Sequence, residues 1–221
     1  MKHLTIPISD EAIRDLRVGD PVQLNGIMLT ARDAAHKWMV ETFVKKTRQP
    51  QGDDLEVYEA IKPLLRGGAI YHCGPVVAGI DTKQYRFVAA GPTTSTREEP
   101  YQSDVMRHFN VKAVIGKGGM GPRTLAACGK VPGVYLHAIG GAASLIAQRV
   151  EKVLGVHKLQ FGVPEAMWVI EVIDFPAVVT MDSHGLSQHA VIDQQSRSEL
   201  EQLLLAGDVG GWLTMDRGWR I

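Results

Sequence analysis

Gly-Pro-Thr-Thr-Ser-Thr-Arg at residues 91–97 and Gly-Lys-Gly-Gly-Met-Gly at residues 116–121 are the two stretches around which the chain is organised. Each follows a run typical of a buried strand, residues 85–90 and residues 111–115, and each precedes a segment typical of a helix. A strand, a polar glycine-rich turn and a helix together place ligand-binding groups at the carboxyl end of the strand. Residues 133–154 repeat this unit, and the repetition predicts an α/β fold with parallel strands.

The side chains in these turns favour a small anion as the ligand. Residues 93–95 carry three hydroxyl groups, and Arg97 and Lys117 supply cations at the ends of what we predict to be neighbouring strands. Arginine binds a carboxylate through two hydrogen bonds, so the pair of cations suits a dicarboxylate. Plainer interpretations remain beside this one, a helix N-cap for the hydroxyl groups and a surface charge for Arg97. The residues by themselves leave the mechanism open.

Three familiar motifs do not fit the chain. A phosphate-binding loop needs Ser or Thr after Gly-Lys, whereas Gly118 follows Lys117. Residues 116–121 match Gly-x-Gly-x-x-Gly formally, but they lie midway along the chain and Pro122 starts the next helix. Asp-Ser-His at 182–184 are sequence neighbours, whereas the groups of a hydrolase triad converge from separate parts of a chain.

Composition narrows the class of protein. The 221 residues contain 24 basic and 24 acidic side chains, and a net charge of zero argues against binding to nucleic acid. No run approaches the roughly 20 apolar residues that cross a bilayer, so we expect no membrane span. The N-terminus lacks a long apolar signal region, and the two cysteines, Cys73 and Cys128, are expected to be reduced thiols in a cytoplasmic protein. Two cysteines are too few for an iron–sulfur cluster.

The N-terminal region predicts a small antiparallel β unit. Residues 3–8 alternate as a strand does, Ser9 can cap a short helix over residues 10–16, and Asn25-Gly26 is typical of a hairpin turn between two short strands. A helix over residues 30–44 follows, with Thr30 or Asp33 as its cap.

Arg32 lies near the start of this helix, where the helix dipole disfavours a cation. It is either a solvated charge of the first turn or a group that joins the helix N-terminus in holding an anion. His36 lies four residues later on the same face and is interpreted as a packing or surface residue. His72 and Cys73 are adjacent in a strand, so they point to opposite faces and cannot share a metal.

The C-terminal half predicts both helices and strands. The third repeat unit should form a helix from residue 140 to about residue 154, and Pro176 should separate a strand at 167–172 from another at 177–181. Further helices are predicted at 102–110, 122–130 and, with amphipathic character, 193–205.

The two glycine-rich stretches, together with Thr-Ala-Arg-Asp-Ala-Ala-His at residues 30–36, resemble the β subunit of class I iron–sulfur fumarate hydratases and L-tartrate dehydratases. The resemblance extends from residue 6 to about residue 192. It implies a swivelling β/β/α domain, which we place at residues 1–206, and it leaves a C-terminal tail at 207–221 unassigned. It also implies that the chain is half of an enzyme.

The resemblance implies a role for each candidate residue. Thr93 would be the base that removes the C–H proton, and Arg32, Arg97 and Lys117 would bind the carboxylates and stabilise the charge that develops, with Lys117 also catalytic. No residue of this chain would bind metal. A [4Fe–4S] cluster would be ligated by a partner α subunit, in an expected α2β2 assembly.

The implied reaction is the reversible hydration of fumarate to (S)-malate. The alternative within the family is dehydration of L-tartrate to oxaloacetate, and the shared motifs do not separate the two. A hypothesis of another class is a domain that binds dicarboxylates without catalysis. The retention of Thr93, Arg97 and Lys117 favours an enzyme.

Overall fold

A computed structural model describes residues 1–205, and their contacts divide the chain into one unit at Met1–Ser187 and another that begins at Gln188. The first unit is an α/β domain, which confirms the predicted fold class. Its strands are β1 (Lys2–Thr5), β2 (Pro21–Thr30), β3 (Ala69–Tyr71), β4 (Val76–Ala78), β5 (Arg86–Ala89), β6 (Ala113–Gly116), β7 (Val134–His137), β8 (Val150–His157) and β9 (Met167–Met181). Its α-helices are α1 (Asp10–Arg14), α2 (Asp33–Met39), α3 (Asp54–Leu65), α4 (Glu99–Phe109), α5 (Pro122–Lys130) and α6 (Ala143–Ala147).

Five strands of the main sheet close into a barrel. The sheet order is β1-β2-β3-β6-β7-β9-β8, and an additional pairing between β2 and β9 joins β2, β3, β6, β7 and β9 in a ring. The main-sheet pairs among β1, β2, β3, β6 and β7 are parallel, as the sequence predicts for the repeated units to which β6 and β7 belong, whereas β9 is antiparallel to β2, β7 and β8. The parallel strands β3, β6 and β7 therefore end on the same side of the barrel.

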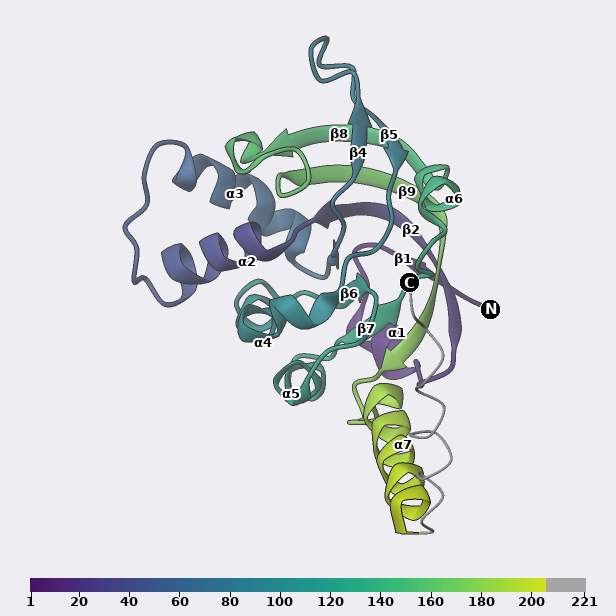
Figure 1. Ribbon diagram of the computed structural model, residues 1–221. Coiled ribbons are helices and arrows are strands. Elements are labelled where there is room, and N and C mark those ends of the chain that lie inside the picture. The colour runs from purple at the N-terminus through teal and green to yellow at the C-terminus, as the bar shows by residue number, and fades with distance from the viewer. Residues whose placement is uncertain (206–221) are drawn as a thin grey trace, which may run out of the picture. The chain divides into compact units, whose positions relative to one another are not determined.

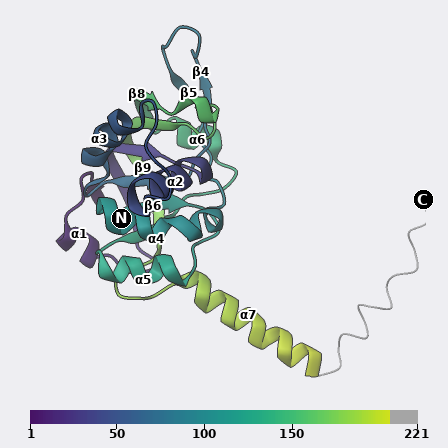
Figure 2. The ribbon, with the colours of Figure 1, turned by 90° about the vertical axis from the view of Figure 1, so that its left-hand side faces the viewer.

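The barrel strands separate two apolar cores. In β3, Ala69 and Tyr71 pack in the core that also holds Trp168 and Phe175, while Ile70 packs in the other core, as the period-two alternation of a strand requires. Helices α2, α3, α4 and α5 cover the side of the strands that carries this second core (Figure 1), and they face the viewer in the turned view (Figure 2).

The predicted antiparallel β unit at the N-terminus is wrong. Strand β2 runs without a turn through Asn25 and Gly26, and it pairs in parallel with β1. Gly26 takes a φ of +118° at a register shift in the pairing with β9, and a Cβ atom there would lie 2.8 Å from the Ile6 carbonyl oxygen. Asn-Gly forms a bulge because β9 pairs with β2 on both sides of it.

Two predictions in the C-terminal half are wrong, and strand β9 explains both. Residues 150–154 belong to strand β8, because they pair with β9, and helix α6 ends at Ala147. Pro176 does not divide β9, which runs unbroken from Met167 to Met181. Asp174, at a φ of +50°, forms the bulge that accommodates the bend, and its N–H donates to the Asn25 side chain (3.0 Å).

The strand at 85–90 is also placed differently from the prediction. Strand β5 pairs with β4 in a separate two-stranded hairpin, and Val88 is exposed. The stretch at residues 91–97 therefore does not follow a strand of the main sheet, and β5 is not a neighbour of β6.

Helix α2 begins at Asp33, and neither predicted cap is used, because Arg32 occupies the N-cap position without a side-chain hydrogen bond. Thr30 ends strand β2. Its hydroxyl oxygen accepts a hydrogen bond from the backbone N–H of Trp168 (3.0 Å) and donates to the carbonyl of Ala166 (3.4 Å). This buried hydroxyl ties β2 to the start of β9.

The second unit contains helix α7 (Gln188–Leu205), which confirms the predicted helix and begins it five residues earlier. The side chains described along residues 193–204 are exposed, so no buried apolar face accompanies the predicted amphipathic character. The predicted tail at 207–221 lies outside the described residues, and the domain boundary at residue 206 stays a prediction. No helix within residues 1–205 is long and apolar enough to cross a membrane.

Thr30→Val should destabilise the domain by about 1–3 kcal/mol, because it leaves the buried N–H of Trp168 without its acceptor. Thr42→Val is the matched control, since the buried Thr42 hydroxyl has no hydrogen-bond partner among the described residues. Urea unfolding of both variants measures the difference. Equal destabilisation by the two substitutions would contradict the role given to Thr30.

Candidate active site

The stretch at residues 91–97 enters a gap between the ends of β3 and β6. The two strands are still joined by the bond from the His72 N–H to the Ile115 carbonyl (2.8 Å). Beyond it, the Thr93 N–H donates to the His72 carbonyl (2.7 Å), and the Lys117 N–H donates to the Thr93 carbonyl (3.2 Å). The backbone of Thr93 thus lies between the extensions of two parallel strands.

Thr93 and Lys117 become neighbours through this insertion, although β5 and β6 are not paired. Thr94 and Lys117 form a parallel β bridge, and the Ser95 N–H donates to the Lys117 carbonyl (3.0 Å). The side chains of Thr93 and Lys117 are half-buried, and Arg97 is exposed in the short 3₁₀ helix η2 (Ser95–Glu98). The structure thus brings the backbones of Thr93 and Lys117 together and leaves both residues, like Arg97, accessible to solvent.

The third glycine-rich turn flanks the same place. The Ala90 N–H donates to the carbonyl of Ala143 in α6 (2.9 Å), just before the stretch begins. A Cβ atom on Gly140 would lie 3.6 Å from Cδ of Lys117. All three repeat units predicted from the sequence therefore contribute to one end of the barrel.

Glu99 fixes the far end of the second stretch. Its carboxylate accepts hydrogen bonds from the N–H groups of Gly121 (2.9 Å) and Arg123 (3.0 Å) and from the hydroxyl of Thr124 (2.6 Å). It therefore caps the N-terminus of α5 from another helix, where a negative charge is favoured. Residues 116–121 are held at both ends.

Arg32 is not a solvated first-turn charge. Its side chain is 19% exposed and forms an ion pair with Glu165 (3.2 Å), whose other oxygen accepts a hydrogen bond from the Ala34 N–H (3.2 Å). A Cβ atom on Gly74 would lie 2.5 Å from a terminal nitrogen of Arg32, so the guanidinium group reaches the loop that follows β3. Glu165 was not predicted as a site residue, because nothing in its sequence neighbourhood relates it to Arg32.

A buried polar network lies beneath the two stretches. Ser95 Oγ lies 2.8 Å from Nδ1 of His72 and accepts a hydrogen bond from the Tyr135 hydroxyl (2.9 Å). The side chain of Gln102 contacts the Nε2 atoms of His72 (2.8 Å) and His36 (2.9 Å). The sequence marks His36 and His72 only as packing residues, and it carries no signal that they meet.

Gly116 leaves the space that this network occupies. A Cβ atom there would lie 1.8 Å from Ser95 Oγ and 3.1 Å from the Tyr135 hydroxyl oxygen. No side chain fits at this position while Ser95 keeps its place. The glycine before Lys117 is thus required by close approach, not by an unusual backbone conformation.

Glu98 is a buried acid beside the site. Its side chain is inaccessible to solvent, and burial raises the pKa of Glu98 to about 9, with the neighbouring Asp33 carboxyl adding to the rise. Neither oxygen of the Glu98 carboxyl group makes a hydrogen bond of ordinary geometry within the described chain. Glu98 is therefore protonated at neutral pH.

The two cysteines do not fit the requirements of a cluster. Cys73 packs in the core inside the barrel and Cys128 in the core beneath the helices, so the strands separate them. Burial raises the pKa of each thiol to about 12, which disfavours the thiolate that a metal needs. Residues 1–205 contain no group of three or more His, Cys, Asp or Glu side chains that could hold a metal.

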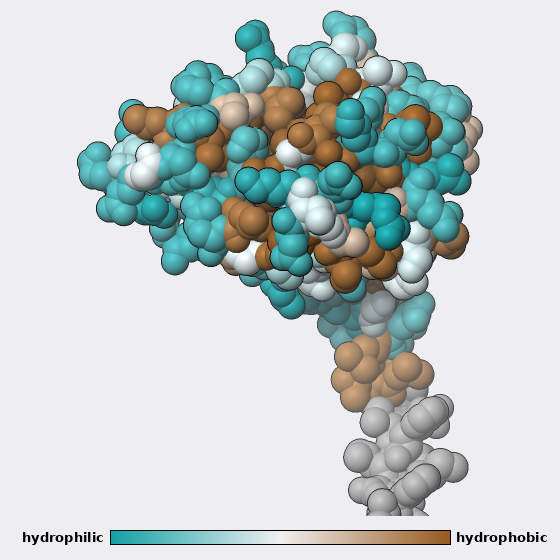
Figure 3. Space-filling view, turned by 90° about the horizontal axis from the view of Figure 1, so that it is seen from above, coloured by the Kyte–Doolittle hydropathy of each residue, from teal (hydrophilic) through white to brown (hydrophobic). Residues whose placement is uncertain are grey.

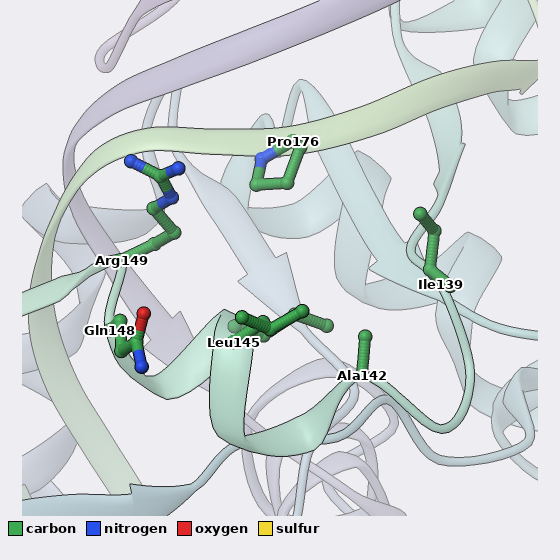
Figure 4. A pocket seen from close by; sticks show the side chains of 7 residues that line it. Ile139, Ala142, Leu145, Gln148, Arg149 and Pro176 are labelled. Atoms are coloured by element: carbon green, nitrogen blue, oxygen red, sulfur yellow. The ribbon is translucent and has the colours of Figure 1, made fainter.

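A pocket of about 200 Å³ lies beside α6, but its lining is mostly apolar (Figure 4). Ile139, Leu145 and Pro176 line it, with Arg149 as its cation, and none of the four predicted site residues does. Apolar side chains also reach the surface elsewhere, in patches between hydrophilic ones (Figure 3). This pocket lacks the several polar groups that a dicarboxylate needs.

Glu98→Gln should change how stability depends on pH. The folded chain binds the Glu98 proton up to about pH 9, whereas the unfolded chain loses it near the ordinary value of 4.5. Stability from this group therefore falls as the pH rises between these two values. The glutamine variant does not lose stability in this way, so its stability relative to that of the wild type should be higher at pH 8 than at pH 5.

Thermal unfolding at the two pH values measures this difference. Glu59→Gln, the same change at an exposed position of α3, should shift stability equally at both. If Glu98→Gln behaves like this control, Glu98 is ionised in the folded protein.

Residues 2–192 match the family described as Fumarase C-terminus. The chain is 50% identical over 199 residues to "Putative fumarate hydratase class I" of Geobacillus stearothermophilus, covering 90% of this chain and 35% of that protein. It is 38% identical over 185 residues to L(+)-tartrate dehydratase subunit beta of Escherichia coli K12, covering 83% of this chain and 84% of that subunit.

A third relative is "Putative L(+)-tartrate dehydratase subunit beta" of Methanocaldococcus jannaschii, 34% identical over 206 residues, which are 92% of this chain and 99% of that protein. The chain thus spans about a third of the Geobacillus protein but nearly the whole of the archaeal subunit. With the family match over residues 2–192, these relationships show that the chain belongs to the Fumarase C-terminus family.

Proposed function

We propose that this chain is the β subunit of a hydro-lyase that interconverts fumarate and (S)-malate together with a cluster-bearing α subunit. The observation that carries the proposal is the insertion of Thr93 between the ends of β3 and β6, next to Lys117. It holds the backbones of these two residues, one bearing a hydroxyl group and the other an amine, next to each other through hydrogen bonds. The 50% identity to a protein named for fumarate hydratase supports the substrate.

The proposed chemistry begins with a proton on the carbon next to a carboxylate. Thr93, activated as its alkoxide, takes this proton from malate, and the electron pair of the C–H bond moves into the carboxylate, which becomes a dianion. When the dianion collapses, the carbon–carbon double bond of fumarate forms and the hydroxyl group leaves the neighbouring carbon, a departure for which the partner's [4Fe–4S] cluster would supply a Lewis acid. Lys117, Arg97 and Arg32 surround the carboxylates and stabilise that charge, because fixed cations lower the energy of a charge that develops in the transition state. Arg32 approaches the site by way of Gly74, with Glu165 holding its other side.

The partner is part of the proposal because residues 1–205 contain no group of side chains that could hold a metal. The buried thiols of this chain lie on opposite sides of the strands, so the [4Fe–4S] cluster is assigned to the α subunit by family resemblance. The Escherichia coli relative is named as a beta subunit, and the Geobacillus relative is about two and a half times as long as this chain. Both facts support an enzyme that needs further polypeptide, which we expect as α2β2 with this domain as its swivelling part.

L-Tartrate is the second candidate substrate. The relative named for tartrate dehydratase aligns over 84% of its own length, which matches the size of this chain better than the Geobacillus protein does. Both substrates are four-carbon dicarboxylates, so the same cations can bind either of them.

Anaerobic co-expression with the cluster-bearing chain from the same genome tests the function. The purified complex should convert malate and fumarate, followed by ultraviolet absorbance, and neither chain should do so separately. Activity on L-tartrate alone would show that tartrate is the substrate, and the proposed hydro-lyase chemistry would stand. A cluster-loaded partner that forms no active complex would favour the domain that binds dicarboxylates without catalysis.

Arg97→Lys in this complex should lower kcat/KM about 10- to 100-fold, because the change keeps the charge but removes one of two hydrogen bonds to a carboxylate, worth about 1.5–3 kcal/mol. Arg107→Lys, at an exposed arginine paired with Asp104 on α4, is the matched control. Equal kinetics for the two variants would remove Arg97 from the substrate site.

A further inference from the structure

Two histidines, one glutamine, one serine and one tyrosine form a continuous buried chain of hydrogen bonds under the candidate site. His36, His72, Ser95 and Gln102 are inaccessible to solvent, as is Tyr135. One end of this series of hydrogen bonds is the Arg32 carbonyl, which lies 2.9 Å from Nδ1 of His36. The hydrogen bonds thus connect the residue before α2 with the stretch that carries Thr93.

The hydrogen-bond partners of His36 and His72 determine which ring nitrogen of each carries hydrogen. Burial lowers the pKa of both His36 and His72, so each ring is neutral and has one N–H. The Arg32 carbonyl can only accept a hydrogen bond, so the N–H of His36 is at Nδ1. Nε2 of His36 is then an acceptor, and the atom of Gln102 that faces it has to be a donor.

The same atom of Gln102 also faces Nε2 of His72, so its amide nitrogen serves both rings with its two hydrogens. The oxygen and nitrogen of an amide exchange by a 180° flip and are assigned from their partners. If the oxygen faced the rings instead, the amide nitrogen would point away from them and would have no hydrogen-bond partner among the described residues. With the nitrogen toward the rings, His72 is left with its hydrogen on Nδ1, from which it donates to Ser95 Oγ.

We propose that Gln102 is a positioning residue that presents its amide nitrogen to both histidines, and thereby fixes their tautomers and the placement of Arg32 and the Ser95 turn. Ser95 Oγ then accepts from both His72 and Tyr135, and its own N–H holds the Lys117 carbonyl. His72 in turn holds the Thr93 N–H with its carbonyl. One amide therefore governs the backbone on both sides of the predicted base.

Nuclear magnetic resonance of the ¹⁵N-histidine-labelled chain tests the tautomers without a partner or any activity. Long-range ¹H–¹⁵N correlations should show His36 and His72 neutral at pH 7, each with its hydrogen on Nδ1. A hydrogen on Nε2 of either ring in the wild type would overturn the proposal. This measurement stands independently of the proposed function.

Kinetics of the assembled enzyme tests the positioning, which rests on the proposed function. Gln102→Glu replaces the donor by an acceptor and should lower kcat about 10- to 100-fold at pH 7 with a smaller effect on KM, since small misplacement of reacting groups is costly. Its activity relative to the wild type should rise as the pH falls, because a protonated carboxyl group regains one donor. Gln102→Met, of similar size without polar atoms, should show no such pH dependence.

If both variants lose activity equally at every pH, Gln102 fills space and the proposal is wrong. An inactive wild-type complex would overturn the proposed function instead, and the tautomers measured in the isolated chain would still decide the assignment of Gln102.

Discussion

The hydrogen bonds that Thr93 and Ser95 make in the gap between β3 and β6 are the constraint on which the site depends. Two parallel strands that part at their ends leave backbone groups without partners, and an unpaired backbone group is costly where water is excluded. The Thr93 N–H and carbonyl and the Ser95 N–H satisfy these groups. The stretch is therefore held as firmly as a strand, although it has the sequence of a loop. A catalytic group on such a segment has a fixed position before any ligand arrives.

The candidate site keeps positive charge, because its cations are only partly neutralised by neighbouring carboxylates. Arg32 shares its charge with Glu165, while the buried Glu98 carries a proton and so does not add a second negative charge near Arg32. Lys117 is half-buried between the backbone of the inserted stretch and Gly140. In the proposed function, these cations would bind the carboxylates of the substrate.

Local features of the chain were predictable, and long-range pairing was not. Helix α5 lies where Pro122 and the preceding glycines predict it, and the three glycine-rich turns meet at one end of the barrel as their repetition indicates. Strand β9 overrides the local signals of Asn25-Gly26 and Pro176, because its pairing with β2 supplies more hydrogen bonds than a turn at either position would. Arg97 and Lys117 were predicted to follow neighbouring strands, but β5 and β6 are not paired. The meeting of His36, His72 and Gln102 depends on tertiary packing, for which the sequence carries no spacing rule.

The separation of Cys73 and Cys128 by the barrel wall has a consequence for how the fold opens. A buried thiol reacts with an alkylating reagent only when its surroundings come apart, so its labelling rate reports that opening. One thiol lies inside the barrel and the other beneath the helices. The alkylation rate of Cys73 therefore reports opening of the barrel interior, and that of Cys128 reports opening of the helical layer. A faster rate for Cys128 would show that the helices separate from the strands before the barrel opens.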